Sequence, residues 1–220
     1  MGKKPYIILI TLASALLSIN ALAQEFRAGV AYEYEILPNF ELDGKAEFRT
    51  TFESQNQYYA IFQVGAGYDF LEHFSIGGTI RLSYVPDDLN HEIDNDIDHE
   101  IDEKTRYTAD FKYKTKRFKN DLRITNRFRY QYSSVDNAKK RTYLRDKIGI
   151  DYKFNKRVKP YLALEPYWRL ETNELRKIRI YIGNELEILK NILEVSFIME
   201  ANMKDSETYT FFMIGVNYKF

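Results

Sequence analysis

Basic side chains recur two or four residues apart along two neighbouring segments in the middle of the chain. Arg123, Arg127 and Arg129 share the odd-numbered positions of the first segment, and Arg145 and Lys147 share those of the second. Residues two apart in a β-strand point to the same face of the sheet. If both segments are strands, these cations form one surface, and guanidinium groups on such a surface bind carboxylates and phosphates. The spacing therefore predicts a basic surface that attracts anions.

Acidic side chains occupy the same alternate positions near the start of the chain. Glu33, Glu35, Glu41 and Asp43 have odd numbers in two consecutive segments, and Glu165 is a single acid on a much later one. Walls of opposite charge would create a field across a narrow lumen and select a small charged solute, as in a channel. The alternative is that the charges pair with one another and plug the interior, because an unpaired buried charge is costly. For Glu165 we expect a lumen ion pair rather than an isolated acid site.

Residues 85–104 form the most acidic stretch, in which the tetrapeptide His-Glu-Ile-Asp occurs twice. Asp94, Asp96 and Asp98 have the spacing of oxygen ligands for a calcium ion. However, His99 stands where the EF-hand loop requires glycine. We therefore expect a solvated acidic loop, and a weakly bound divalent cation is the only cofactor that the sequence suggests.

An enzyme embedded in a membrane is a competing hypothesis. Hydrolases of that kind need a serine activated by a histidine that a third polar group orients. The chain has no cysteine and three histidines, His73, His91 and His99, which lie in an expected turn or in the acidic loop. The sequence thus predicts no catalytic residue, and a narrow channel or a structural envelope protein is the preferred interpretation.

Strands must position these residues, because apolar and polar side chains alternate almost to the end of the chain. We expect about eleven strands of roughly 10 to 13 residues, joined by connections that are alternately short and longer. Bacterial single-chain barrels have an even number of strands, so ten or twelve is the expected count. The pattern predicts an all-β fold, an antiparallel up-and-down transmembrane β-barrel. The alternating segments are 26–36, 40–52, 58–70, 74–84, 107–113, 122–132, 143–154, 161–170, 178–186, 193–199 and 212–220.

Alternation alone does not tell which face lies inside the barrel. A soluble secreted barrel that binds a ligand would point its apolar face inward, whereas a membrane barrel points it at lipid. The chain has 18 Tyr and 15 Phe, which would overfill the interior of a small soluble barrel. Many tyrosines fall near the ends of the expected strands, where an amphipathic ring suits the membrane–water boundary. We therefore favour the membrane barrel and keep the soluble barrel as the alternative.

The first 23 residues are typical of an export signal. Lys3 and Lys4 precede an apolar stretch, and Ala21-Leu-Ala23 fits a cleavage site, so residues 24–220 form the expected mature domain. Lys and Arg total 32 and Asp and Glu also total 32. This balance gives no basic field for nucleic acid. The sequence predicts export to the outer membrane of a Gram-negative bacterium.

Three segments resemble an uncharacterised family of short bacterial outer-membrane β-barrel proteins, known as domain of unknown function 2490. They are residues 141–154, residues 159–167 and residues 215–220. The last strand, which ends on Phe220, also resembles the terminal strand that the barrel-assembly machinery recognises. The resemblance implies a barrel fold, an outer-membrane location, contact with membrane lipid, and assembly by that machinery. It implies no activity, and the oligomeric state stays open.

Overall fold

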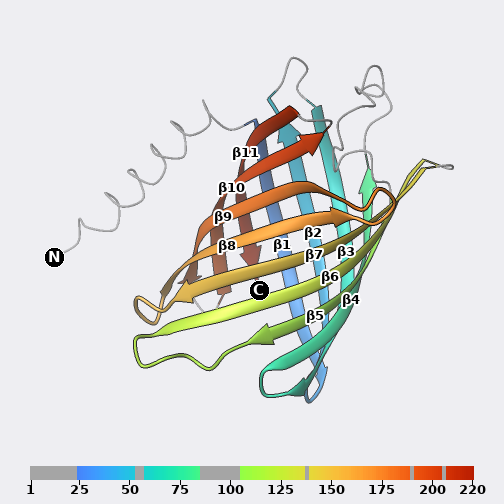
Figure 1. The fold of residues 1–220 in the computed structure, drawn as a ribbon. Coiled ribbons are helices and arrows are strands. Elements are labelled where there is room, and N and C mark those ends of the chain that lie inside the picture. The colour runs from blue at the N-terminus through green and yellow to red at the C-terminus, as the bar shows by residue number, and fades with distance from the viewer. Residues whose placement is uncertain (1–23, 53–56, 85–104, 137–138, 189–190, 205–206) are drawn as a thin grey trace.

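A computed structural model describes most of the chain after the expected export signal. The described residues are 24–52, 57–84, 105–136, 139–188, 191–204 and 207–220. They form eleven strands and no helix, so the expected all-β fold is confirmed (Figure 1). Within these residues, no helix is long and apolar enough to cross a membrane. The strands are β1 (Glu25–Leu37), β2 (Phe40–Thr51), β3 (Gln57–Leu71), β4 (Phe74–Tyr84), β5 (Thr105–Lys114), β6 (Leu122–Asp136), β7 (Lys139–Tyr152), β8 (Val158–Arg169), β9 (Glu174–Ile188), β10 (Asn191–Lys204) and β11 (Glu207–Lys219).

The sheet closes on itself, and every neighbouring pair is antiparallel except the pair that closes it. β1 and β11 run parallel, with Phe26 opposite Ile214 and Val30 opposite Tyr218. The backbone N–H of Phe220 donates to the carbonyl of Ala31 over 3.0 Å. The expectation of an even strand number is therefore wrong. An up-and-down chain with an odd number of strands brings its first and last strands together in the same direction, so only a parallel pair can close the barrel.

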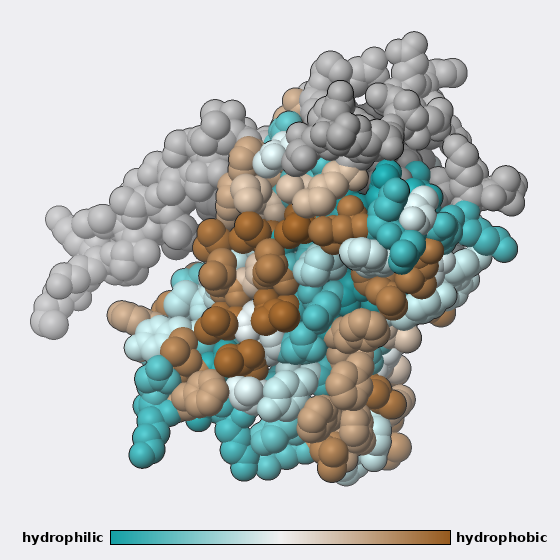
Figure 2. Space-filling model, in the orientation of Figure 1, coloured by the Kyte–Doolittle hydropathy of each residue, from teal (hydrophilic) through white to brown (hydrophobic). Residues whose placement is uncertain are grey.

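The polar and apolar faces of the strands divide between the inside and the outside of the barrel. Apolar side chains point outward, and Phe62 and Val64 are 56% and 62% exposed. Figure 2 shows apolar residues over much of the visible wall. Arg49 and Glu165 on the other face are only 4% and 0% exposed. The wall is thus built opposite to a soluble ligand-binding barrel, whose apolar face would line the interior.

The connections define two ends, which we call the turn end and the loop end. The turn end contains the β1–β2, β3–β4, β5–β6, β7–β8 and β9–β10 connections and Phe220, whereas Gln24 lies at the loop end (Figure 1). The expected contrast in average length between the ends is present, but it depends on a single connection. Residues 85–104 separate β4 from β5 in the sequence, whereas the β6–β7 and β10–β11 connections are shorter than expected, because β6, β7, β10 and β11 extend further than their apolar alternation indicates. The charged and polar residues at these strand ends remain paired in the ladders.

β8 contains two prolines, yet it pairs on both sides. Pro160 lies opposite Asn184 and Pro166 opposite Ile178 in the β8–β9 ladder. In the β7–β8 ladder, pairing stops after Arg145–Tyr167 and resumes at Ile148–Leu164. Proline has no N–H to donate, so the gap falls next to Pro166. The interruption leaves Glu165 on the lumen side of a strand segment that is bonded to only one neighbour.

Candidate functional site in the barrel lumen

Glu165 of β8 is the centre of a buried polar network in the lumen. Arg127 on β6 and Arg145 on β7 each donate from Nη2 to Glu165 Oε1, over 2.8 and 2.9 Å. The hydroxyls of Tyr181 and Tyr167 donate to Oε2, over 2.6 and 3.3 Å. Both carboxylate oxygens therefore have two donors, and a carboxylate with 0% exposure is stabilised by two cations at once.

The network continues from Tyr167 toward β9 and β10. Arg179 donates from Nη1 to the Tyr167 hydroxyl over 2.7 Å, and its guanidinium is ion-paired with Glu200. Lys177 Nζ lies 3.5 Å from Glu200 Oε1. The Arg145 guanidinium lies 4.1 Å from the centre of the Tyr167 ring, which is a cation–π distance. Four strands are thus joined by charge-assisted contacts as well as by their backbones.

On the other side of Glu165, the network reaches β5 and β6. Arg129 donates to both carboxylate oxygens of Asp110, each over 2.5 Å. Arg145 also donates from Nη1 to Gln131 Oε1 over 2.7 Å, and Gln131 donates to Ser133 over 3.0 Å. Bidentate pairing fixes the guanidinium plane as well as its distance. Arg129 and Arg145 lie directly opposite each other and pair with different carboxylates, Asp110 and Glu165.

A second cluster occupies the lumen at β1 to β3. Glu25 is ion-paired with Arg27, and Glu47 with Arg49. The Tyr59 hydroxyl donates to Glu25 over 3.3 Å, and the Arg49 guanidinium lies 5.8 Å from the centre of the Tyr59 ring. The wall opposite the Glu165 network therefore also presents charges that are already paired.

Together, these side chains fill the loop-end half of the lumen in the described part of the chain. Every strand contributes at least one lumen side chain there that is less than a tenth exposed. One such residue from each strand, in chain order, is Arg27, Arg49, Tyr59, Arg81, Arg106, Ser133, Tyr143, Tyr167, Lys177, Asn202 and Met213.

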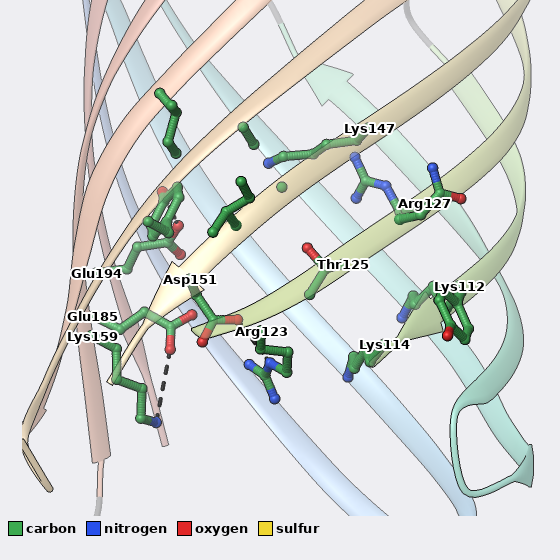
Figure 3. A pocket seen from close by; sticks show the side chains of 17 residues that line it. Lys112, Lys114, Arg123, Thr125, Arg127, Lys147, Asp151, Lys159, Glu185 and Glu194 are labelled. Atoms are coloured by element: carbon green, nitrogen blue, oxygen red, sulfur yellow. Dashed lines mark hydrogen bonds and ion pairs between the residues drawn. The ribbon is translucent and has the colours of Figure 1, made fainter. Parts of the chain in front are cut away.

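The turn-end half of the lumen contains a cavity of about 350 Å³, shown in Figure 3. That volume is at the lower end of the range for small-molecule sites, roughly 300–1,000 Å³. Arg127, which donates to Glu165, lies with Lys147 at one end of the cavity, and Lys114 and Lys159 lie toward the turn end. The cavity is thus bounded on one side by the filled half of the lumen.

Tyr161 and Gly183 shape one wall of the cavity. A Cβ at Gly183 would lie 2.5 Å from Cζ of Tyr161, so the glycine lets the ring lie flat against β9. In this position the Tyr161 hydroxyl donates to Glu194 over 2.6 Å. Glu194 also has Lys219 Nζ at 3.5 Å, so its charge is already matched.

Acidic residues face the lumen at the turn end of β1 and β2. Glu33 lies opposite Asp43, and Glu35 lies opposite Glu41. In the order of strands around the barrel, β1 and β2 are about as far as possible from β6. An acidic wall and a basic wall therefore stand across the turn-end half of the lumen from each other.

The structure brings most of the predicted lumen residues together. Arg123, Arg127, Arg129, Arg145, Lys147 and Glu165 all lie on adjacent strands β6 to β8, whereas Glu33 and Glu35 lie on the opposite wall. For Glu165 the expected ion pair in the lumen is present. The sequence did not identify four lumen residues of this region, namely Asp110, Lys112, Tyr181 and Glu200. The predicted lumen charges are at odd-numbered positions, whereas three of these residues have even numbers and Tyr181 is aromatic. The alternation of polar and apolar residues assigns them to the lumen face, but it does not predict which side chains they contact.

The proposed calcium ligands Asp94, Asp96 and Asp98 lie outside the described residues, so this prediction stays open. In the part of the chain that is described, no group of acidic or histidine side chains could hold a metal ion. His73 lies in the β3–β4 turn, 3.9 Å from Glu72. The Lys116 ammonium, 3.0 Å from Glu72, lowers the pKa of that exposed carboxyl through a hydrogen bond.

Asn126 and Asp146 form a polar pair among the apolar side chains of the outer face. Asn126 donates from Nδ2 to Asp146 Oδ1 over 2.5 Å, and both residues occupy positions that point away from the lumen. They are the two residues that interrupt the apolar alternation of their strands. The hydrogen bond satisfies part of the polarity that each would otherwise present on the outer face.

Comparisons with known proteins give a family and no activity. Curated proteins gave no significant match to the chain. The model of the family described as "Protein of unknown function (DUF2490)" matches residues 28–210, from the first strand into the last. Because this match covers most of the chain, the protein belongs to the DUF2490 family.

Proposed function

We propose that this chain is an integral outer-membrane β-barrel protein whose lumen is closed in the resting state and holds a solute-sized chamber at the turn end. The observation that carries the proposal is the division of the wall, apolar outside and charged inside. A barrel leaves no unpaired strand edge, and it satisfies all backbone groups by pairing between strands, as a bilayer requires. Lipid is the solvent that suits such an outer face.

Aromatic side chains at both ends of the outer face support the same proposal. Near the loop end, Tyr58, Tyr84 and Tyr107 are between 48% and 64% exposed. Near the turn end, Phe154 and Phe220 are 69% and 58% exposed. Girdles of aromatic rings at two levels are typical of transmembrane barrels, where they sit at the headgroup boundaries.

Export, insertion and orientation belong to this proposal. Residues 1–23 would direct secretion and be removed, and the strand ending on Phe220 would be recognised by the barrel-assembly machinery. Short turns of such barrels face the periplasm. The cavity would then open to the periplasm, and the loop end of the barrel would face the cell surface.

Fractionation and folding assays test the membrane proposal. The full chain is expressed in a Gram-negative host, and we expect it in the outer membrane, with a mature N-terminus at Gln24. Its gel mobility should change on heating, as for a folded barrel. A soluble periplasmic protein with an unchanged band would contradict the proposal. Phe220→Ala is the variant expected to lower the inserted fraction, and Phe154→Ala is a matched control that removes another exposed ring at the same end.

The closed lumen favours a chamber or a gated path over an open pore. The filled loop-end half contains paired charges, and opening it would require breaking several ion pairs together. In planar bilayers, we expect the purified wild-type protein to show no sustained conductance at low voltage. A steady open channel would contradict the closed state. A purely structural barrel is the second candidate, favoured by the four donors that saturate Glu165.

A further inference from the structure

Three cations stand directly opposite one another across β5, β6 and β7. Lys112 is paired in register with Arg127, and Arg127 is paired in register with Lys147. All three side chains line the cavity at the turn end (Figure 3). Like charges directly opposite each other on one face of a sheet repel and destabilise the pairing. This row is therefore a place where the protein maintains repulsion that a bound anion would relieve.

The row has few protein carboxylates of its own. Arg127 reaches Glu165, but that carboxylate is shared with Arg145. Lys147 Nζ lies 3.7 Å from the centre of the Tyr181 ring. Among the described residues, Lys112 and Lys147 have no carboxylate within ion-pair distance.

The acids of the cavity are already engaged elsewhere. Asp151 accepts from Arg123 over 2.7 Å and from Arg117 over 2.5 Å. Glu194 accepts from the hydroxyl of Tyr161 and faces Lys219, and Glu185 lies 4.0 Å from Lys159. Lys112 interacts electrostatically with Asp110, which Arg129 already holds through both oxygens, and with Asp43 of β2. The carboxylates around the row are thus shared with other cations rather than dedicated to it.

We propose that the turn-end cavity binds a small solute carrying two or more carboxylate or phosphate groups, held by Lys112, Arg127 and Lys147. The proposal rests on the proposed function for the solute's route to the cavity, and it adds the chemical class of the solute. Ammonium groups act as point charges toward such anions, and the guanidinium adds planar donors. A volume of about 350 Å³ admits a metabolite-sized anion.

The acidic wall across the lumen restricts where the anionic groups of the solute can lie. Glu33, Glu35, Glu41 and Asp43 would repel a second anionic group placed at β1 and β2. The anionic groups of the solute are therefore expected to gather on the β5–β7 side, with any neutral or cationic part toward β1. A compact polyanion, or a molecule with its anionic groups at one end, meets this requirement.

Calorimetry with defined probes tests the site. Purified full-length protein in neutral detergent is titrated with pyrophosphate or citrate at constant ionic strength, and glucose serves as the uncharged control. We expect saturable binding of at least one polyanion and none of glucose. Lys112→Gln and Lys147→Gln should each weaken binding about tenfold or more, because each removes one charge-assisted contact.

Two controls separate the site from general charge effects. Lys116→Gln removes one positive charge at the same end, outside the cavity lining, and should leave the affinity unchanged. Lys112→Arg keeps the charge and should retain binding. Acetylation of wild-type lysines provides a measurement that needs no variant, since pyrophosphate should protect Lys112 and Lys147 and should not protect Lys116.

The results distinguish failure of the anion site from failure of the proposed function. Absence of polyanion binding at millimolar concentration, an equal loss in Lys116→Gln, or equal protection of all three lysines would overturn the anion site. A protein that is embedded and non-conducting but binds no polyanion retains the proposed function and loses this inference. A protein that is found in the soluble fraction and still binds pyrophosphate through Lys112 retains the site and loses the proposed function.

Discussion

Replacing Glu165 by glutamine removes one charge from the centre of the lumen and keeps the shape of the side chain. In Glu165→Gln, the Arg127 and Arg145 guanidiniums lose the negative charge of the carboxylate whose Oε1 they share at 2.8 and 2.9 Å. Arg145 is 4% exposed, so water replaces little of the lost interaction. Removing one partner of a buried ion pair costs about 3–5 kcal/mol. We expect the free energy of unfolding to fall by that amount.

Urea titration in lipid vesicles measures this loss. The single tryptophan, Trp168, lies on β8 and reports on the same strand through its fluorescence. The matched control is Glu185→Gln, a half-buried acid 4.0 Å from Lys159, whose loss should cost less than about 1 kcal/mol. If Glu165→Gln were as stable as Glu185→Gln, the buried ion pairs of Glu165 would not contribute to stability as we infer.

Conductance provides an independent test of the same variant. If the paired charges close the lumen, the repulsion between Arg127 and Arg145 in Glu165→Gln should loosen that region and produce current steps in planar bilayers. The double variant Glu165→Gln with Arg145→Gln removes that repulsion and should recover part of the lost stability. Equal losses in the single and double variants, without any current, would contradict the electrostatic explanation.

The two faces of β3 should differ in their tolerance of charge. Val64→Arg places a cation on the outer face and should lower the free energy of unfolding in lipid by about 2–4 kcal/mol. Gln63→Arg places it in the lumen and should change that free energy by less than about 1 kcal/mol. Equal losses in urea titration would contradict the assignment of the two faces. Asp146→Leu removes the charged member of the outer polar pair and should raise the midpoint of unfolding in lipid vesicles, whereas a lower midpoint would indicate a protein partner at that position. Because eleven strands place the chain ends at opposite ends of the barrel, tags at Gln24 and Phe220 should be cleaved by protease from opposite sides of the membrane, and cleavage from one side would contradict the parallel closure.

Much of the wall could be predicted from the sequence. A strand has a period of two, so alternation alone assigns each side chain to one face. This is why the outer apolar residues and the lumen position of Arg127 and Glu165 agree with prediction. The ends of the strands were less predictable, because the charged residues near Lys139 and Glu207 hide the alternation although the backbone remains paired.

The partners within the lumen could not be predicted. Glu165 is joined to Arg127, 38 residues earlier in the chain, and to Tyr181, 16 residues later. Such contacts depend on the register of each strand relative to its neighbour. A one-residue change of register would turn a strand's side chains to the other face. The local pattern contains no measure of that offset. The row of Lys112, Arg127 and Lys147 could not be predicted either, because it depends on the register of three strands.

The sequence by itself determined that the protein is a barrel wall with one apolar and one charged face, because that property depends only on residues two apart. Only the tertiary structure decided that eleven strands close through a parallel pair and that the loop-end half of the lumen is filled, and it showed that the apolar face lies outside, as the aromatic content had indicated. These features depend on long-range pairing, in which each strand's direction and register are fixed by its neighbours around the closed sheet. The same pairing converts scattered charges into a buried network at one end and a basic cavity at the other.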